Sequence, residues 1–391
     1  MTPVSDAERV ARATLLRVTE PGTAGVVERV REVGVAQTLA DIAAGRPIGD
    51  ADVAALQHRL RTASGAADLE AATAVGARLV CPDDAEWPRA LDDLAWVGRD
   101  CFGLWVRGPH LLAEACEQAV AVVGTRAATD YGLAMADRLA GGLAELGWTV
   151  VSGLAYGIDT AAHRATLGVG GLTVACVACG IDRVYPPGNR ALFERIAAEG
   201  LLVSEHPPGA APYRTRFLVR NRIIAALSQG TLVVEMAVRS GARSTATHAA
   251  AINRHVMCVP GPVTSALSAG CHQLLRERPE TVLVTRASEV VEQCGPMGAL
   301  APRQRGPAVV RDQLGPAVAR VLEGVPVRRA ASAASIATAA GVSLAVAEAA
   351  LAALGTAGLV RRTDEGWGMT PAGRDDRRVR RAEVQESLDL W

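Results

Sequence analysis

AVVGTRAATDYG…WTVVSGLAYGIDTAAH, read from residue 121 to residue 163, contains two short apolar segments, and each leads into a glycine-bearing loop that opens a helical pattern. In such a unit, several backbone N–H groups and the positive end of a helix dipole face one point. Arg126 follows Gly124 and Thr125 in the first loop, so a planar cation stands where an oxyanion would be held. The stretch therefore predicts a phosphate-binding loop for a nucleotide or a nucleic-acid backbone.

Strand and helix patterns alternate between about residues 116 and 292. The expected strands are 119–123, 149–152, 172–178, 201–205, 231–235, 255–259 and 281–284. Most are continuous runs of Val, Leu and Ile, which is typical of strands with both faces covered by helices. The pattern predicts an α/β fold with a doubly wound, mostly parallel, Rossmann-like sheet. Ligands of such sheets bind beyond the carboxyl ends of the strands, where the glycine loops lie.

The regions on either side predict smaller domains. Residues 1–80 carry apolar positions at helical spacing with glycine and proline breaks, so we expect a small helical domain before the sheet domain of 81–294. Residues 295–312 have the composition of a linker. Three short helices and a hairpin within 313–372 predict a winged-helix-like domain, and 373–391 form an Arg-rich tail.

Composition limits the classes of function. The 391 residues include 41 basic and 41 acidic side chains, and every basic one is Arg, so affinity for nucleic acid must come from a local patch. The eight cysteines are scattered, the start of the chain is polar, and no apolar run reaches the length of a membrane span. We therefore expect a reduced, cytoplasmic protein without a metal or cofactor.

Nucleotide motifs with known spacing are absent. The first loop lacks G-x-G-x-x-G, and a chain without Lys cannot form a P-loop, so NAD and classical ATP sites are disfavoured. Ser152, Asp159 and His163 do not form a recognised nucleophile motif, and Asp159 is expected to cap a helix starting at Thr160. Cys176 and Cys179 would face opposite sides of a strand and are expected to pack in the core. We predict no catalytic residue and no enzymatic activity.

The segment RTRFLVRNR, residues 214–222, gathers cations around one aromatic side chain. It contains Arg214, Arg216, Arg220 and Arg222, with Phe217 among them. Cations for phosphates beside a ring that stacks on a base are what single-strand binding requires. A solvated helix start with Phe217 in the core fits the same residues, and composition does not separate these two interpretations.

Seven blocks in order make a family resemblance specific. They are VVGTRAATDYG, VVSGLAYGIDTAAHRATL, CGIDRVYPPGN, LVSEHPPG, FLVRNRIIAALS, VVEMAVRSGARSTATHAA and VMCVPGPVTSALSAGCHQLLRE. Over about residues 85–295 the chain resembles the DNA-processing protein A family, called DprA or Smf. Those proteins protect incoming single-stranded DNA and load the RecA recombinase during natural transformation.

The resemblance implies a set of DNA-contacting residues and partners. They are Gly124, Thr125, Arg126, Ser152, Gly153, Ala155, Gly157, Arg214, Phe217, Arg220, Asn221, Arg222, Ser240, Gly241 and Thr245. Arg126 and Arg214 are expected on phosphates and Phe217 on a base. Single-stranded DNA and RecA are the implied partners, the protein is expected to be a homodimer, and the N-terminal domain is expected to be sterile-alpha-motif-like or helix-hairpin-helix-like.

Two further points qualify the resemblance. Pro187 stands after Tyr185 and Pro186 where some members carry Lys, and Arg183 and Arg190 are the candidates to replace that cation. The fold also resembles phosphoribohydrolases of the lysine-decarboxylase-like group, in which a Glu at a strand end would correspond to Glu235. Their P-G-G-x-G-T-x-x-E signature is absent here, so a nucleotide-binding hydrolase is the alternative function.

Overall fold

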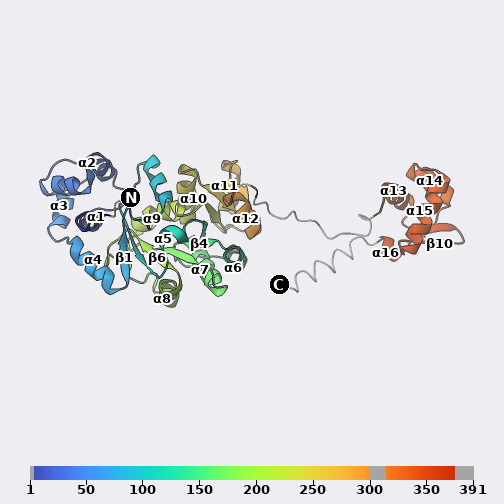
Figure 1. Cartoon of the computed structure of the whole chain (residues 1–391). Helices are drawn as coiled ribbons and strands as arrows, with labels where there is room; N and C mark the ends of the chain where they lie inside the picture. The colour runs from blue at the N-terminus through green and yellow to red at the C-terminus, as the bar shows by residue number, and fades with distance from the viewer. Residues whose placement is uncertain (1–3, 297, 299–313, 375–391) are drawn as a thin grey trace. The chain divides into compact units, whose positions relative to one another are not determined.

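The computed structural model describes residues 4–296, 298 and 314–374, which fall into two compact units (Figure 1). The first unit contains the N-terminal helices and the large sheet, and the second contains the short C-terminal elements. The expected linker, 295–312, and the expected tail, 373–391, lie largely outside the described residues. The two units are described separately.

A nine-stranded sheet forms the centre of the first unit. Its strands are β1 (Ala77–Val80), β2 (Leu104–Arg107), β3 (Ala119–Val123), β4 (Thr149–Ser152), β5 (Thr173–Cys176), β6 (Leu201–Ser204), β7 (Gly230–Val233), β8 (His255–Cys258) and β9 (Val282–Leu283). The order is β1-β2-β6-β5-β4-β3-β7-β8-β9. All neighbours from β6 to β9 are parallel, whereas β1 and β2 extend the sheet antiparallel beyond β6. The expected mostly parallel, Rossmann-like sheet is confirmed.

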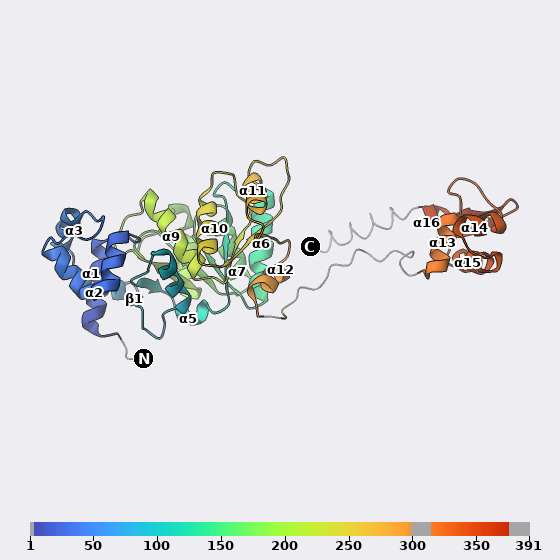
Figure 2. The ribbon, with the colours of Figure 1, turned by 90° about the horizontal axis from the view of Figure 1, so that it is seen from above.

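Helices cover both faces of the sheet, as the apolar strands predict. Ala119, Ala121 and Val123 of β3 pack toward η1, α5, α9, α10 and α11, whereas Val120 and Val122 pack toward α6, α7 and α12. The first set of helices is η1 (Arg89–Val97), α5 (Leu112–Ala115), α9 (Arg214–Ala226), α10 (Gly241–Ala251) and α11 (Ala269–Glu277). The second is α6 (Asp130–Glu145), α7 (Ile158–Gly168) and α12 (Ala287–Cys294), and α8 (Arg190–Glu199) packs beside α7. Figure 2 shows α12 beside α6.

Four helices precede the sheet: α1 (Asp6–Val18), α2 (Ala24–Ala43), α3 (Val53–Leu60) and α4 (Gly65–Ala74). Helix α2 is broken at Gly34, whose φ of 80° is accessible to glycine at low cost. Leu15 and Leu16 of α1 share one apolar cluster with Phe102 and with Trp105 of β2. The N-terminal helices therefore pack on the sheet and form one unit with it.

The second unit consists of α13 (Pro316–Gly324), α14 (Ala333–Ala340), α15 (Leu344–Thr356), the antiparallel strands β10 (Val360–Thr363) and β11 (Gly366–Met369), and α16 (Pro371–Arg374). Leu322, Ile336, Leu351 and Leu354 form its core. The three helices and the hairpin lie where the sequence indicates, and their winged-helix class stays a prediction. No single described helix is long and apolar enough to cross a membrane; α14 and α15 reach that length only together, across a bend of 105°.

The strand order reverses at β3. From β3 the chain moves outward through β4, β5 and β6, and then returns to the other side of β3 with β7, β8 and β9. The connections that follow β3 and β7 therefore leave the sheet in different directions, and a crevice opens beyond the carboxyl ends of these strands. This topology places the first glycine loop at the sheet's natural ligand-binding position.

Candidate nucleic-acid interface

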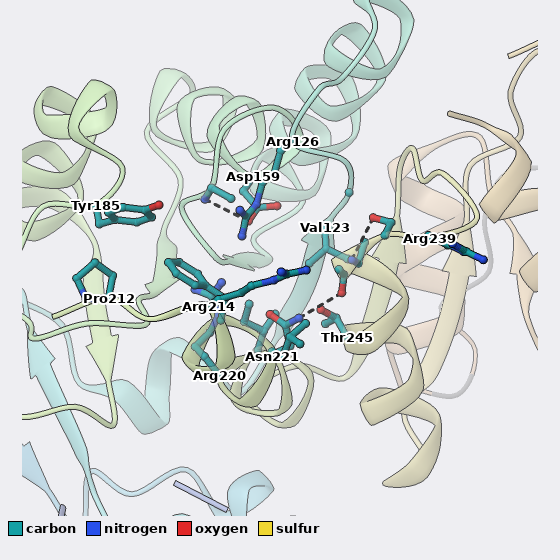
Figure 3. A pocket seen from close by; sticks show the side chains of 18 residues that line it. Val123, Arg126, Asp159, Tyr185, Pro212, Arg214, Arg220, Asn221, Arg239 and Thr245 are labelled. Atoms are coloured by element: carbon teal, nitrogen blue, oxygen red, sulfur yellow. Dashed lines mark hydrogen bonds between the residues drawn. The ribbon is translucent and has the colours of Figure 1, made fainter. Parts of the chain in front are cut away.

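A crevice of about 550 Å³ lies at this reversal point (Figure 3). The loops after β3, β4, β5 and β7 contribute to it, together with α9 and the start of α10. The predicted residues that line it are Gly124, Arg126, Ala155, Arg214, Phe217, Arg220, Asn221, Ser240, Gly241 and Thr245. Residues far apart in the sequence thus meet in one place.

The side chains of Arg126 and Phe217 are in contact at the crevice. The Arg126 guanidinium carbon lies 5.3 Å from the centroid of the Phe217 ring, a cation–π distance. Tyr185 lies on Phe217 with 5.3 Å between ring centroids and a tilt of 47°. Arg126 is exposed, and Phe217 is half-buried. The arrangement presents a cation and an aromatic ring at the same opening, so one nucleotide could contact both.

Helix α9 separates its four arginines by function. Arg214 is exposed at the crevice. Arg216 pairs with Glu20 of the N-terminal region, with 3.0 Å between Nε and Oε2. Arg222 is fully buried, and its Nη2 donates to Glu205 at 2.7 Å. The expected DNA contact by Arg222 is therefore wrong, because its guanidinium has no access to solvent and neutralises a buried carboxylate.

Arg220 forms part of the crevice floor. Its Nη1 donates to the carbonyl oxygen of Gly153 at 2.9 Å and also to that of Cys176. The side chain is only 6% exposed, and burial lowers the pKa of its guanidinium. Arg220 therefore holds the loops after β4 and β5 together beneath the crevice.

Four predicted residues build the crevice without lining it. The Ser152 hydroxyl is buried and donates to Val122 O at 2.6 Å, and the Gly153 carbonyl is occupied by Arg220. A side chain on Gly157, whose φ is 77°, would come within 2.3 Å of Thr125 O. Thr125 is buried and its N–H donates to Glu235 O at 2.7 Å. The resemblance implied DNA contact by these loops, largely through their backbone; in the structure these four residues join the two glycine loops beneath the crevice.

The carboxylate of Glu235 lies outside the crevice. It is 1% exposed, and its two oxygens accept from the Thr129 N–H at 2.9 Å and the Thr129 hydroxyl at 2.7 Å. A Cβ on Gly132 would lie 2.3 Å from Oε2, so no substrate has room beside it. Glu235 fixes the start of α6, and the hydrolase alternative is not favoured.

The sequence triad does not assemble. Helix α7 begins at Ile158 with Gly157 as its N-cap, so the expected capping role of Asp159 is wrong. Asp159 instead accepts from the Ala155 N–H at 3.3 Å, and burial raises the pKa of its carboxyl. His163 shares a 2.7 Å hydrogen bond with the Thr173 hydroxyl, and burial lowers its pKa to about 3. The Ser152 hydroxyl is used elsewhere.

Cys176 and Cys179 are buried in the core, as expected, and lie in different apolar clusters. Burial raises the pKa of Cys176 to about 12 and that of Cys179 to about 11, so both are poor thiolates. Among residues 4–296, 298 and 314–374, no group of His, Cys, Asp and Glu is arranged to hold a metal ion.

Sequence reasoning did not assign eight of the lining residues to the site: Val123, Asp159, Tyr185, Pro212, Leu218, Ile224, Arg239 and Ala242. Arg239 is exposed and directly precedes the predicted Ser240 and Gly241 loop, so its position next to that motif was the available signal. Tyr185 had been noted only as the neighbour of a missing Lys. Within the described part of the chain, Arg126, Arg214 and Arg239 have no ion-pair partner, so the crevice carries three uncompensated cations.

Comparison with known proteins gives a consistent result. The profile of a family described as DNA recombination-mediator protein A matches residues 78–295. A Mycobacterium tuberculosis H37Rv protein that bears the DprA name is 45% identical over 371 residues, which cover 93% of this chain and 95% of that protein. DNA processing protein DprA of Streptococcus pneumoniae R6 is 42% identical over 174 residues, 44% of this chain and 61% of that protein. The X-ray structure of DNA processing protein A from Streptococcus pneumoniae has a TM-score of 0.62 at 30% identity, covering 75% of this chain and 99% of that one.

Proposed function

Since this chain belongs to the DNA recombination-mediator protein A family, also called DprA or Smf, we propose that its crevice binds single-stranded DNA during DNA processing in natural transformation or recombination. The observation that carries the proposal is the Arg126–Phe217 pair at a crevice with two further uncompensated arginines, Arg214 and Arg239. Guanidinium groups bind phosphate oxygens, and aromatic rings stack on bases. A strand of nucleic acid offers both groups at each nucleotide.

The shape of the site favours a single strand over a duplex. Phe217 is half-buried inside the crevice, so a base must leave its stack to reach the ring. In a duplex this costs a few kcal/mol in lost pairing and stacking, whereas a single strand avoids the pairing cost. The crevice volume of about 550 Å³ lies within the range of small-molecule sites, and it suits an extruded base better than a helix.

The partners and the non-enzymatic role form the rest of the proposal. We propose that the bound strand is passed to the RecA recombinase, in keeping with the family's description as a recombination mediator. A homodimer would place two crevices along one strand and raise affinity through effective concentration. Binding without catalysis is supported by Glu235, whose oxygens are occupied by Thr129. A cytoplasmic location belongs to the same proposal.

Arg126→Ala tests the site directly. We expect the variant to bind labelled oligothymidylate about tenfold or more weakly than the wild type, because it loses a phosphate contact and the cation above Phe217. The slope of log K against log salt should fall by about 0.7 for one lost phosphate contact on a single strand. Fluorescence anisotropy across a salt series, with unlabelled duplex as competitor, measures both quantities.

Arg195→Ala is the matched control. Arg195 lies on α8, pairs with Glu199 and donates to Leu167 O near the end of α7. Leu167 and Glu199 precede β5 and β6, at the amino ends of these strands, whereas the crevice lies beyond the carboxyl ends. Its removal should leave affinity and salt slope unchanged. Equal binding by wild type and Arg126→Ala at low salt, or preference for the duplex, would contradict the proposed site.

A further inference from the structure

Aromatic residues gather around the crevice beyond what the composition predicts. The chain has only four tyrosines and three phenylalanines. Tyr185 and Phe217 line the crevice, and Tyr156 follows the lining residue Ala155. Tyr156 is 48% exposed and Tyr185 is 38% exposed. Aromatic side chains carry a large apolar area, so rings left this open at a binding crevice have surface available to a ligand.

The three rings are connected through the loop that follows β5. Phe217 contacts Tyr185 at 5.3 Å between centroids. Two residues beyond Pro186, the Gly188 N–H donates to the Tyr156 hydroxyl at 3.2 Å. A Cβ on Gly188 would come within 2.8 Å of that hydroxyl and 3.2 Å of the ring. Tyr156 is therefore held against the loop that carries Tyr185, and its ring is fixed before any ligand arrives.

A fourth aromatic residue does not belong to this series. Tyr213 precedes α9 and is 58% exposed, but the Arg216 guanidinium carbon lies 4.8 Å from its ring centroid. Arg216 is held over Tyr213 by its ion pair with Glu20, whereas Arg126 over Phe217 has no ion-pair partner in the described part of the chain and can exchange the ring for a phosphate. The open rings of Tyr156 and Tyr185 belong instead to the loops after β4 and β5.

Cations accompany the open rings. Arg183 and Arg190 flank the loop and are exposed, and neither has an ion-pair partner in the part of the chain that the structure describes. The nearby Asp182 uses one oxygen to accept the Gly209 N–H at 2.8 Å. Rings interleaved with arginines provide stacking for bases and charge for the backbone, which is the composition of a single-strand track.

We propose that the DNA strand leaves the crevice across Tyr185 and Tyr156, which stack on further bases and extend the binding site over the loops after β4 and β5. This inference rests on the proposed function, because it assigns the path of the same strand. It makes the site longer than the crevice and gives the strand one preferred exit. Affinity should then depend on oligonucleotide length through Tyr156.

The experiment compares a short oligothymidylate of about 4 nucleotides with one of about 16, the range of single-strand site sizes. Tyr156→Ala should weaken binding of the long oligonucleotide about five- to hundredfold, the loss of one stacked base, and leave the short one unchanged. Its salt slope should stay that of the wild type, since no phosphate contact is lost. Phe217→Ala should weaken both lengths.

Two substitutions separate stacking from local structure. Tyr156→Phe keeps the ring, loses the bond to Gly188, and should bind the long oligonucleotide within a few-fold of the wild type. Tyr156→Leu keeps apolar bulk without an aromatic face and should behave as Tyr156→Ala. Tyr131→Ala is the control for removing an exposed tyrosine, because Tyr131 is 38% exposed, against 48% for Tyr156, but does not line the crevice.

The outcomes distinguish this inference from the proposed function. Tyr156→Ala and Tyr156→Leu could be folded and bind the long oligonucleotide as the wild type does, while Phe217→Ala binds more weakly. The proposed path across Tyr185 and Tyr156 would then be wrong, and the proposed binding site in the crevice would be supported. If the wild type binds neither length, both proposals fail. A loss for the long oligonucleotide alone supports the track.

Discussion

Burial decides what each arginine of α9 does. Arg214 and Arg222 are both arginines of the helix RTRFLVRNR, yet one is exposed at the crevice and the other is 0% exposed beside Glu205. A buried guanidinium without its carboxylate partner is costly, as is the carboxylate left alone. An exposed guanidinium keeps its water and remains free to exchange it for a phosphate. Identical residue types on one helix therefore divide into structural and binding groups.

Arg222→Ala should therefore reduce the stability of the protein, whereas Arg214→Ala should reduce its binding of single-stranded DNA. Arg222→Ala leaves Glu205 buried without its partner and should lower the free energy of unfolding by about 3–5 kcal/mol. Arg214→Ala should change it by at most about 0.5 kcal/mol, but should weaken single-strand binding and reduce its salt dependence. Urea unfolding and anisotropy on the same samples measure both. An Arg222→Ala protein of normal stability that binds DNA poorly would mean that Arg222 acts on DNA after all.

The sequence indicated the cluster of arginines on α9, but it could not show which of them are exposed and which are held in ion pairs. The Arg216 partner, Glu20, lies 196 positions away, and the Arg222 partner, Glu205, lies 17 positions away. Neither spacing belongs to a local pattern such as the i, i+4 pairs of a helix, so only the folded chain identifies these pairs. Gly124 and Arg126 were predictable because they directly follow a strongly apolar strand, whereas the Ser240–Gly241 loop was indicated only by the family resemblance.

At the scale of elements, apolar runs predicted the parallel strands of the sheet but not its two antiparallel strands. The expected strands 119–123 and 149–152 coincide with β3 and β4, and the other five overlap their observed counterparts. Strands β1 and β2 were missed. Each has four residues, and both lie before residue 116, where the alternation of strand and helix patterns begins. Antiparallel edge strands of this length lack a clear period.

Helix α9 is held in place by the N-terminal region. Arg216 donates to Glu20 at 3.0 and 2.6 Å, and Arg17 donates to Pro208 O at 2.8 Å in the segment before α9. Burial alone would raise the pKa of Glu20, but the hydrogen bond and charge of Arg216 lower it overall. Arg214 and Phe217 flank Arg216 on the same helix, so this anchor positions two crevice residues without touching the crevice.

Breaking the anchor should weaken DNA binding indirectly. Glu20→Gln and Arg216→Gln should each reduce affinity a few-fold, and the double variant should be no worse than either, because neighbouring residues in one ion pair are not additive. The pair is partly exposed, with Glu20 at 42%, so the coupling should be about 1 kcal/mol. A double-mutant cycle by anisotropy gives this energy. Additive losses would mean that Arg216 contacts DNA itself.

At the scale of the whole molecule, the N-terminal helices and the sheet depend on one another. Leu15, Leu16, Phe102 and Trp105 share a single apolar cluster, and the anchor of α9 crosses the same boundary. The composition of residues 1–80 indicated a separate helical domain, and that division stays a prediction. Composition reports which segments are helical, whereas the contacts between segments decide which of them can fold alone. Acid stability is a property of this whole unit, because its titrating groups are distributed across it.

Buried histidines should make the protein lose stability as pH falls from about 6.5 toward 4.5. Burial lowers the pKa of His163 to about 3 and that of His206 to about 4. In the unfolded chain both groups bind protons below about pH 6.5. Over this pH range the unfolded state therefore binds protons that the native state does not bind. Each histidine lowers the free energy of unfolding by up to about 1.4 kcal/mol per pH unit. Asp159 acts in the opposite direction, because burial raises its pKa.

Urea unfolding at about pH 7 and pH 5 measures this loss. His206→Asn removes one titrating group, so the difference in unfolding free energy between the two pH values should shrink by about 2 kcal/mol relative to the wild type. His58→Asn provides the control, because it replaces a histidine that is exposed rather than buried, and it should leave the difference unchanged. Above about pH 4.5 most carboxylates remain ionised, so they contribute little to the difference in unfolding free energy between the two pH values. If His206→Asn keeps the full wild-type difference, the acid sensitivity does not come from this histidine. That result would contradict a buried, neutral His206 beneath α9.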